Sequence, residues 1–195
     1  QAALDAAFAG CAAVFHTASP FFIGGDRYTE EDLCGPAVKG TTAVLAAARA
    51  AGTVEMVVVT ASTACVYCRT GKGADHEFSE ADWSGLDALR ANKDWYAVSK
   101  VLAERAAHAW AAEAAAPALC VLHPTLILGP MLQPGLNTSS ALIRAYLAGD
   151  KDEVPATSKC IVDVRDVAAA HWRAFEARTA GFAPPRCLLI GACPT

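Results

Sequence analysis

Short apolar runs alternate along the chain with longer segments in which apolar residues recur every three or four positions. The runs lie at 11–15, 57–62, 118–122 and 187–190, and a further one at 161–167 turns from strand into helix. Helical spacing covers 36–51, 95–116 and 136–148. Short β-branched runs are typical of buried parallel strands, and strand, helix, strand at these lengths indicates right-handed parallel units. The pattern therefore predicts an α/β sheet.

Three stretches interrupt this pattern. Residues 21–33, with acidic Glu30, Glu31 and Asp32, are predicted to be mostly loop. The segment 82–84 is predicted to cap the helical residues that follow it, and Asn137 or Thr138 is predicted to cap the helix at 136–148. The prolines that flank the apolar residues 125–129 indicate a shaped wall more than a ladder strand.

The run 95–100, Trp-Tyr-Ala-Val-Ser-Lys, carries the first candidate chemistry. Tyr96 and Lys100 are four residues apart, so on a helix they share one face. A phenol has an ordinary pKa of about 10, and a fixed ammonium beside it favours the phenolate. We therefore expect Lys100 to bring the Tyr96 pKa towards neutrality and to retain protons for a ribose hydroxyl.

Ser62 supplies the third member of the constellation, because it ends the strand-like run 57–62. Ligands of open α/β sheets bind at the carboxyl ends of the strands. A serine to polarise a carbonyl oxygen and a tyrosine to protonate it, with a hydride from a nicotinamide, make a site for carbonyl reduction. Small residues at the end of an earlier run, Thr17, Ala18 and Ser19, would let a cofactor approach the backbone closely.

Composition narrows the class of protein. The chain has 195 residues, of which 54% are hydrophobic and 18% charged, with a net charge of -4. This suffices for one domain, residues 1–195, with a real core, and it argues against nucleic-acid or anionic-membrane partners. Each apolar stretch is interrupted well short of the roughly 20 residues of a membrane span. A cytoplasmic location is the expectation.

Eight cysteines are many for such a chain. Cys65 and Cys68 form C-x-x-C, but no second pair completes one of the usual zinc patterns, so no metal is predicted. Most of the cysteines lie in apolar runs, where cysteine behaves as a small hydrophobic residue. Buried reduced thiols are predicted over disulfides, with oxidation of Cys65 and Cys68 left open.

Five segments, in order, resemble the extended short-chain dehydrogenase/reductases of the plant dihydroflavonol reductase and cinnamoyl-CoA reductase type. They are 14–20, 59–62, 95–100, 124–139 and 162–171. The resemblance implies a Rossmann-like doubly wound parallel sheet, and an NADPH-dependent reductase with Ser62, Tyr96 and Lys100 as its catalytic residues. It also implies that these residues contact the cofactor: Thr17, Ala18, Ser19, Tyr96, Lys100, Pro124, Thr125, Leu126, Ile127 and Ser139.

Departures from the family pattern bear on the substrate. Tyr67 stands where dihydroflavonol reductases commonly hold ring hydroxyls with an asparagine, and the residues around Tyr96 differ from those of true cinnamoyl-CoA reductases. The segment 129–139 resembles the cinnamoyl-CoA reductase-like group that acts on aromatic carbonyls. The expected substrate is therefore a small aldehyde or ketone with an aromatic or extended apolar body, contacted by Tyr67 and Ser62 and covered mainly by residues 129–160 and 180–195.

The family's glycine-rich turn and first three strands are missing from this sequence, so the resemblance covers a partial Rossmann-like sheet. We expect a fragment that is marginally stable alone, because an open sheet edge exposes strand and helix faces; for the intact protein a monomer is favoured. Two alternatives remain. One is a noncatalytic binding or regulatory module that has lost its cofactor half, and the other is a sugar-nucleotide epimerase on the same fold.

Overall fold

A computed structural model describes the chain except residues 21–27, 74, 152, 154–158, 182–183 and 194–195. Its main sheet has the strand order β1-β2-β3-β6, and all three pairings are parallel. The strands of this sheet are β1 (Ala13–His16), β2 (Met56–Thr60), β3 (Ala118–Pro124) and β6 (Arg186–Leu189). A second, two-stranded parallel sheet pairs β4 (Leu126–Leu128) with β5 (Ile161–Asp163).

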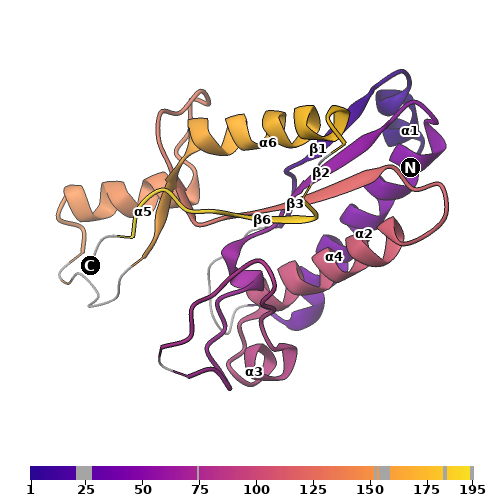
Figure 1. Cartoon of the computed structure of the whole chain (residues 1–195). Coiled ribbons are helices and arrows are strands. Elements are labelled where there is room, and N and C mark those ends of the chain that lie inside the picture. Colours follow the sequence, from indigo (N-terminus) through magenta and orange to yellow (C-terminus); the bar gives the residue numbers. More distant parts are fainter. Residues whose placement is uncertain (21–27, 74, 152, 154–158, 182–183, 194–195) are drawn as a thin grey trace.

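Helices cover both faces of the main sheet, with α2 and α4 on one side and α6 on the other (Figure 1). The helices are α1 (Ala2–Phe8), α2 (Glu30–Ala50), the short 3-10 turn η2 (Thr63–Cys65), α3 (Leu86–Ala91), α4 (Trp95–Ala111), α5 (Thr138–Leu147) and α6 (Val164–Thr179). The partial doubly wound α/β sheet that the sequence predicts is therefore confirmed.

Strand β2 shows why this arrangement forms. Successive side chains of a strand point to opposite faces, and both faces are buried here. Val57 and Val59 pack in the core with α2 and α4, whereas Met56 and Val58 pack in a second core with Ala174 of α6. An apolar run without alternation is thus what a strand between two helical layers requires.

Three local predictions are wrong. Residues 30–33 are not loop, because α2 already begins at Glu30, where Thr29 and Asp32 form a capping box. In this box the Thr29 N–H donates to Asp32 Oδ2 at 2.8 Å. Residues 21–27 of the predicted loop lie outside the described part. Asp82 does not cap α3, whose first turn follows Gly85 without a side-chain bond. Asp82 binds Lys72 instead, at 2.7 Å.

The third error concerns the apolar residues between the two prolines. Leu126–Leu128 form the ladder strand β4, paired with β5, and β3 continues through Pro124. Proline is tolerated at this end of β3 because the hydrogen bond to β6 is made by the next residue, Thr125. The Thr125 N–H donates to the Leu189 carbonyl at 3.1 Å. The α5 cap is correct, since Asn137 accepts a bond from the Ser140 N–H at 2.8 Å.

Within the described residues, no helix is long and apolar enough to cross a membrane.

Candidate active site

Ser62 lies where the sequence places it, just beyond the carboxyl end of β2. The Ala61 N–H donates to the Leu122 carbonyl at 2.8 Å, which continues the β2 to β3 ladder one residue past the strand. Ser62 then caps the turn η2, because its hydroxyl accepts a bond from the Ala64 N–H at 3.2 Å. The hydroxyl is thus fixed at the sheet edge where ligands of open α/β sheets bind.

Helix α4 presents Tyr96 and Lys100 to the same edge. Asp94 caps the helix by accepting a bond from the Ala97 N–H at 3.1 Å, which sets its first turn. Lys100, four residues after Tyr96, places its ammonium 5.7 Å from the centre of the Tyr96 ring. The helix is held against the sheet by fully buried Val98 and Val101.

A cavity of about 530 Å³ joins these residues. Every predicted site residue lines it except Ala18: Thr17, Ser19, Ser62, Tyr67, Tyr96, Lys100, Pro124, Thr125, Leu126, Ile127 and Ser139. The residues that sequence reasoning missed are Thr60, Ala61, Thr63, Lys159 and Cys160. The first three adjoin Ser62 and could have been found from it, whereas Lys159 and Cys160 precede a strand start and carry no pattern.

Burial controls the protonation of the site. It raises the pKa of Tyr96, an effect only partly opposed by a hydrogen bond from Ser62 and reinforced by the negative charge of Asp94. The expected lowering of this pKa by Lys100 is therefore wrong for this structure. Burial also lowers the pKa of Lys100 itself. At neutral pH Tyr96 consequently holds its proton, and its hydrogen bond with Ser62 joins the two hydroxyls.

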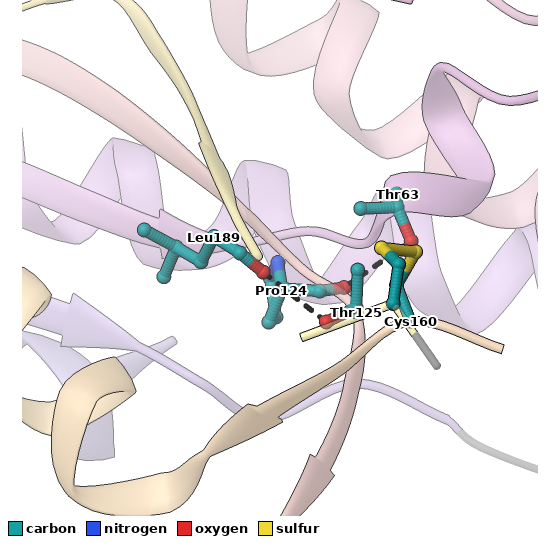
Figure 2. Close-up of a disulfide and its surroundings, with 6 residues drawn as sticks. Thr63, Pro124, Thr125, Cys160 and Leu189 are labelled. Atoms are coloured by element: carbon teal, nitrogen blue, oxygen red, sulfur yellow. Dashed lines mark hydrogen bonds between the residues drawn. A yellow bond between two sulfur atoms is a disulfide. The ribbon is translucent and has the colours of Figure 1, made fainter. Parts of the chain in front are cut away.

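The prediction of reduced thiols is wrong for one pair. Cys160 and Cys193 form a disulfide, with Cα atoms 4.0 Å apart. The Ile161 N–H donates to the Ala192 carbonyl at 2.7 Å, so main-chain pairing brings the neighbouring cysteines together. Figure 2 shows this disulfide beside Thr63 and Thr125, at the cavity wall.

The other six cysteines, including Cys65 and Cys68, are free thiols. Cys65 also lies close to Glu104 and His123, and one ligand atom from each falls within 4.8 Å of the others. Two features disfavour a cation there. The Arg186 guanidinium already binds the Glu104 carboxylate at 2.7 Å, and burial raises the pKa of Cys65, which keeps it a thiol.

Named plant reductases are similar to this chain. Cinnamoyl-CoA reductase 1 of Arabidopsis thaliana is 40% identical over 178 residues, which are 91% of this chain and 50% of that protein. Tetraketide alpha-pyrone reductase 2 of the same plant is 33% identical over 178 residues, 90% of this chain and 55% of that protein. The chain thus spans about half the length of these relatives.

Solved structures with the same fold include vestitone reductase from alfalfa, with a TM-score of 0.80 and 30% identity over 98% of this chain and 58% of that one. Yeast methylglyoxal/isovaleraldehyde reductase Gre2, solved with NADPH, gives a TM-score of 0.82 and 29% identity over 98% of this chain and 60% of that one.

The family described as "NAD dependent epimerase/dehydratase family" matches residues 1–190, which include every element of both sheets. The parallel sheet, its helices on both faces and the hydroxyl and ammonium groups at its carboxyl edge agree with that match. The chain belongs to the NAD-dependent epimerase/dehydratase family.

Proposed function

We propose that this chain is the catalytic part of an NADPH-dependent reductase of aromatic or extended apolar aldehydes and ketones. The observation that carries the proposal is the convergence of Ser62, Tyr96 and Lys100 on one cavity, with a hydrogen bond between Ser62 and Tyr96. The similarity to several named carbonyl reductases supports it.

The donor groups of the cavity fit the nicotinamide end of a dinucleotide. Thr17 and Ser19 follow β1, Ser139 opens α5, and Lys100 brings a cation, whereas the described lining contains no carboxylate. These hydroxyl and ammonium groups are suited to a ribose and an amide. The bound cofactor would supply the hydride, and the lining residues named here would hold it.

Each of the three residues then has a defined task. Ser62 donates a hydrogen bond to the substrate carbonyl oxygen, and Tyr96 transfers its phenolic proton to that oxygen as the carbonyl carbon receives the hydride. The product is an alcohol and the phenolate of Tyr96, whose negative charge the ammonium of Lys100 stabilises until a proton returns. The raised pKa of Tyr96 in the free protein keeps the proton in place for this transfer.

The cavity wall favours an apolar substrate. Pro124, Leu126 and Ile127 form one side, and Tyr67, whose ring lies 5.3 Å from that of Phe78, forms part of the rest. An aromatic ring can pack against these surfaces while its carbonyl reaches Ser62. This supports aromatic or extended apolar carbonyl compounds as the substrate class.

The test uses an extended form, in which the part of Arabidopsis cinnamoyl-CoA reductase 1 that precedes the matched region is joined ahead of residue 1. NADPH oxidation is measured with cinnamaldehyde, phenylacetaldehyde, feruloyl-CoA and dihydroquercetin. Turnover of at least one carbonyl compound is expected, and Tyr96→Phe should lower kcat by about 10²- to 10⁴-fold, the usual contribution of a positioned acid.

Tyr146→Phe is the matched control, because Tyr146 lies on α5 outside the cavity lining and should leave kcat unchanged. A folded extended form that binds NADPH but reduces none of the four compounds would refute the reductase. Interconversion of sugar nucleotides by that form, using tightly bound NAD, would identify an epimerase instead, and binding without turnover would identify a binding module.

A further inference from the structure

Below the cavity, α4 carries a buried carboxylate that the catalytic scheme does not use. Glu104 lies four residues after Lys100, one helical turn further along the same face. Its side chain is fully buried. Burial alone would raise its pKa, but the nearby His108, whose Nε2 lies 3.5 Å from Oε1, the bonds from His123 and Arg186, and the His123 charge together hold the pKa well below its usual range. Glu104 is therefore an ionised group inside the protein.

The partners of Glu104 come from other elements of the fold. His123 Nε2 lies 2.8 Å from its Oε1 and Arg186 Nε 2.7 Å from the same oxygen. His123 is in β3 and Arg186 in β6. The Cys65 sulfur, at the end of η2, lies within 4.8 Å of a Glu104 carboxylate oxygen. One carboxylate thus binds groups from two strands and lies against the turn.

These connections are close in sequence to the residues of the proposed chemistry. Cys65 follows Ser62 by three residues, and His123 directly precedes Pro124 of the cavity wall. Lys100 is one turn from Glu104. The groups that would polarise the carbonyl, border the cofactor and deliver the proton are therefore tied to a single charged side chain.

Arg186 extends the connection to the loop beside Tyr67. Its guanidinium lies 4.0 Å from the centre of the Trp83 ring and donates to the Asp82 carbonyl at 2.7 Å. The adjacent Ser84 hydroxyl accepts a bond from the Cys68 N–H at 3.0 Å. Movement of Arg186 would therefore reach the loop that carries Tyr67.

We infer that Glu104 is a positioning residue, which sets the helix bearing Tyr96 and Lys100 against the strand and turn that carry Pro124 and Ser62. The inference rests on the proposed reductase function. An ion pair joined by several hydrogen bonds fixes direction as well as distance, which apolar packing alone does not. Displacement of a reacting group by about 1 Å costs on the order of 10²-fold in rate.

The first variant is Glu104→Gln in the extended form, which keeps the side-chain shape and removes the charge. We expect kcat to fall about 10- to 100-fold, while KM for the carbonyl compound and for NADPH changes less than about threefold, because no residue of the cavity lining is replaced. Glu113→Gln is the matched control. Glu113 lies just after the same helix, paired with Arg49 at 2.6 Å but exposed, and its loss should leave kcat unchanged.

The second variant, Glu104→Gln with Arg186→Gln, removes the cation that the first variant leaves buried and unpaired. The double variant should unfold at a higher temperature than Glu104→Gln. Its kcat should nevertheless remain about 10-fold or more below that of the wild type. Recovery of kcat together with stability would overturn the inference, because the loss would then come from unfolding alone. An unchanged kcat in folded Glu104→Gln would overturn it as well.

A readout without turnover separates this inference from the proposed function. The ionisation of Tyr96 is followed by ultraviolet absorbance as the pH is raised. The absorbance of the Tyr96→Phe variant is subtracted in each background, wild type and Glu104→Gln, so that the remaining signal comes from Tyr96. The raised Tyr96 pKa should fall towards its ordinary value in Glu104→Gln, because a shifted helix lets water reach the phenol. An unchanged titration would refute positioning, whereas absence of carbonyl reduction by the wild type would refute only the function.

Discussion

Gly129 offers a stringent test of the packing between the end of β4 and the start of α6. It follows β4 directly, with φ of 140°. A Cβ at this position would lie 2.8 Å from Val164 Cγ1 and 3.3 Å from the Val164 nitrogen. Gly129→Ala therefore meets two obstacles, a backbone conformation that only glycine adopts freely and a neighbour that is too close.

The two costs can be estimated separately. A non-glycine residue in such a region costs about 1–3 kcal/mol, and overpacking against a β-branched side chain adds about 1–3 kcal/mol. We expect Gly129→Ala to lower the free energy of unfolding by about 2–6 kcal/mol. Urea unfolding of the extended form, followed by tryptophan fluorescence, measures the change.

The controls separate these contributions. Gly135→Ala has nothing within 4 Å of its added Cβ and should change stability by less than about 0.5 kcal/mol. Adding Val164→Ala to Gly129→Ala should recover the stability lost to the close contact, whereas the cost of the strained backbone should remain. A double-mutant cycle measures the recovered part. A loss no larger than that of Gly135→Ala would refute the reasoning about this contact.

Three further predictions concern ionisation and oxidation. The pKa of Glu104 is lower in the folded protein than its ordinary value of 4.5, so its ionisation stabilises the fold above pH 4.5 and this stability is lost as the pH falls. Glu104→Gln should therefore weaken the acid dependence of the free energy of unfolding, measured by urea unfolding at each pH. The pKa of Tyr96 is higher in the folded protein than its ordinary value of 10.0, so stability is lost as the pH rises past 10.0, and Tyr96→Phe should weaken this alkaline dependence. An unchanged pH dependence in either variant would contradict the pKa shift given for that residue. Thiol titration of the denatured, unreduced chain should find six free thiols and not eight, because two of the eight cysteines form the disulfide. The disulfide joins residues 33 positions apart, so replacing both Cys160 and Cys193 by Ser should lower the free energy of unfolding by about 3–4 kcal/mol.

Local patterns carried much of the fold and of the site. The apolar runs predicted the strands, because a strand between two helical layers needs no polar positions. The spacing of Tyr96 and Lys100 and the place of Ser62 at a strand end predicted three residues that do line one cavity. Thr29 and Asp32 have the spacing of a capping box in the sequence as well, but residues 21–33 are predicted as mostly loop.

Features that depend on distant partners were not predictable in this way. In the sequence Glu104 is a single acidic residue in an alanine-rich helix, and no local pattern marks it as buried. The Cys160–Cys193 disulfide depends on the pairing of Ile161 with Ala192, which no local pattern specifies. The direction of the Tyr96 pKa shift does not follow from its spacing to Lys100, because the largest cause is burial, which is a property of the folded protein.

The bond between Glu104 and Arg186 also constrains the order in which the molecule can form during synthesis. The two residues are 82 positions apart, and a ribosome adds about 5–20 residues per second. Arg186 therefore emerges about 4–16 s after Glu104, whereas a helix forms in about a microsecond. Throughout that interval α4 carries an acidic group without its guanidinium partner. In that interval the carboxylate can pair with His123 of β3, but its bond to a guanidinium must wait until β6 has been made.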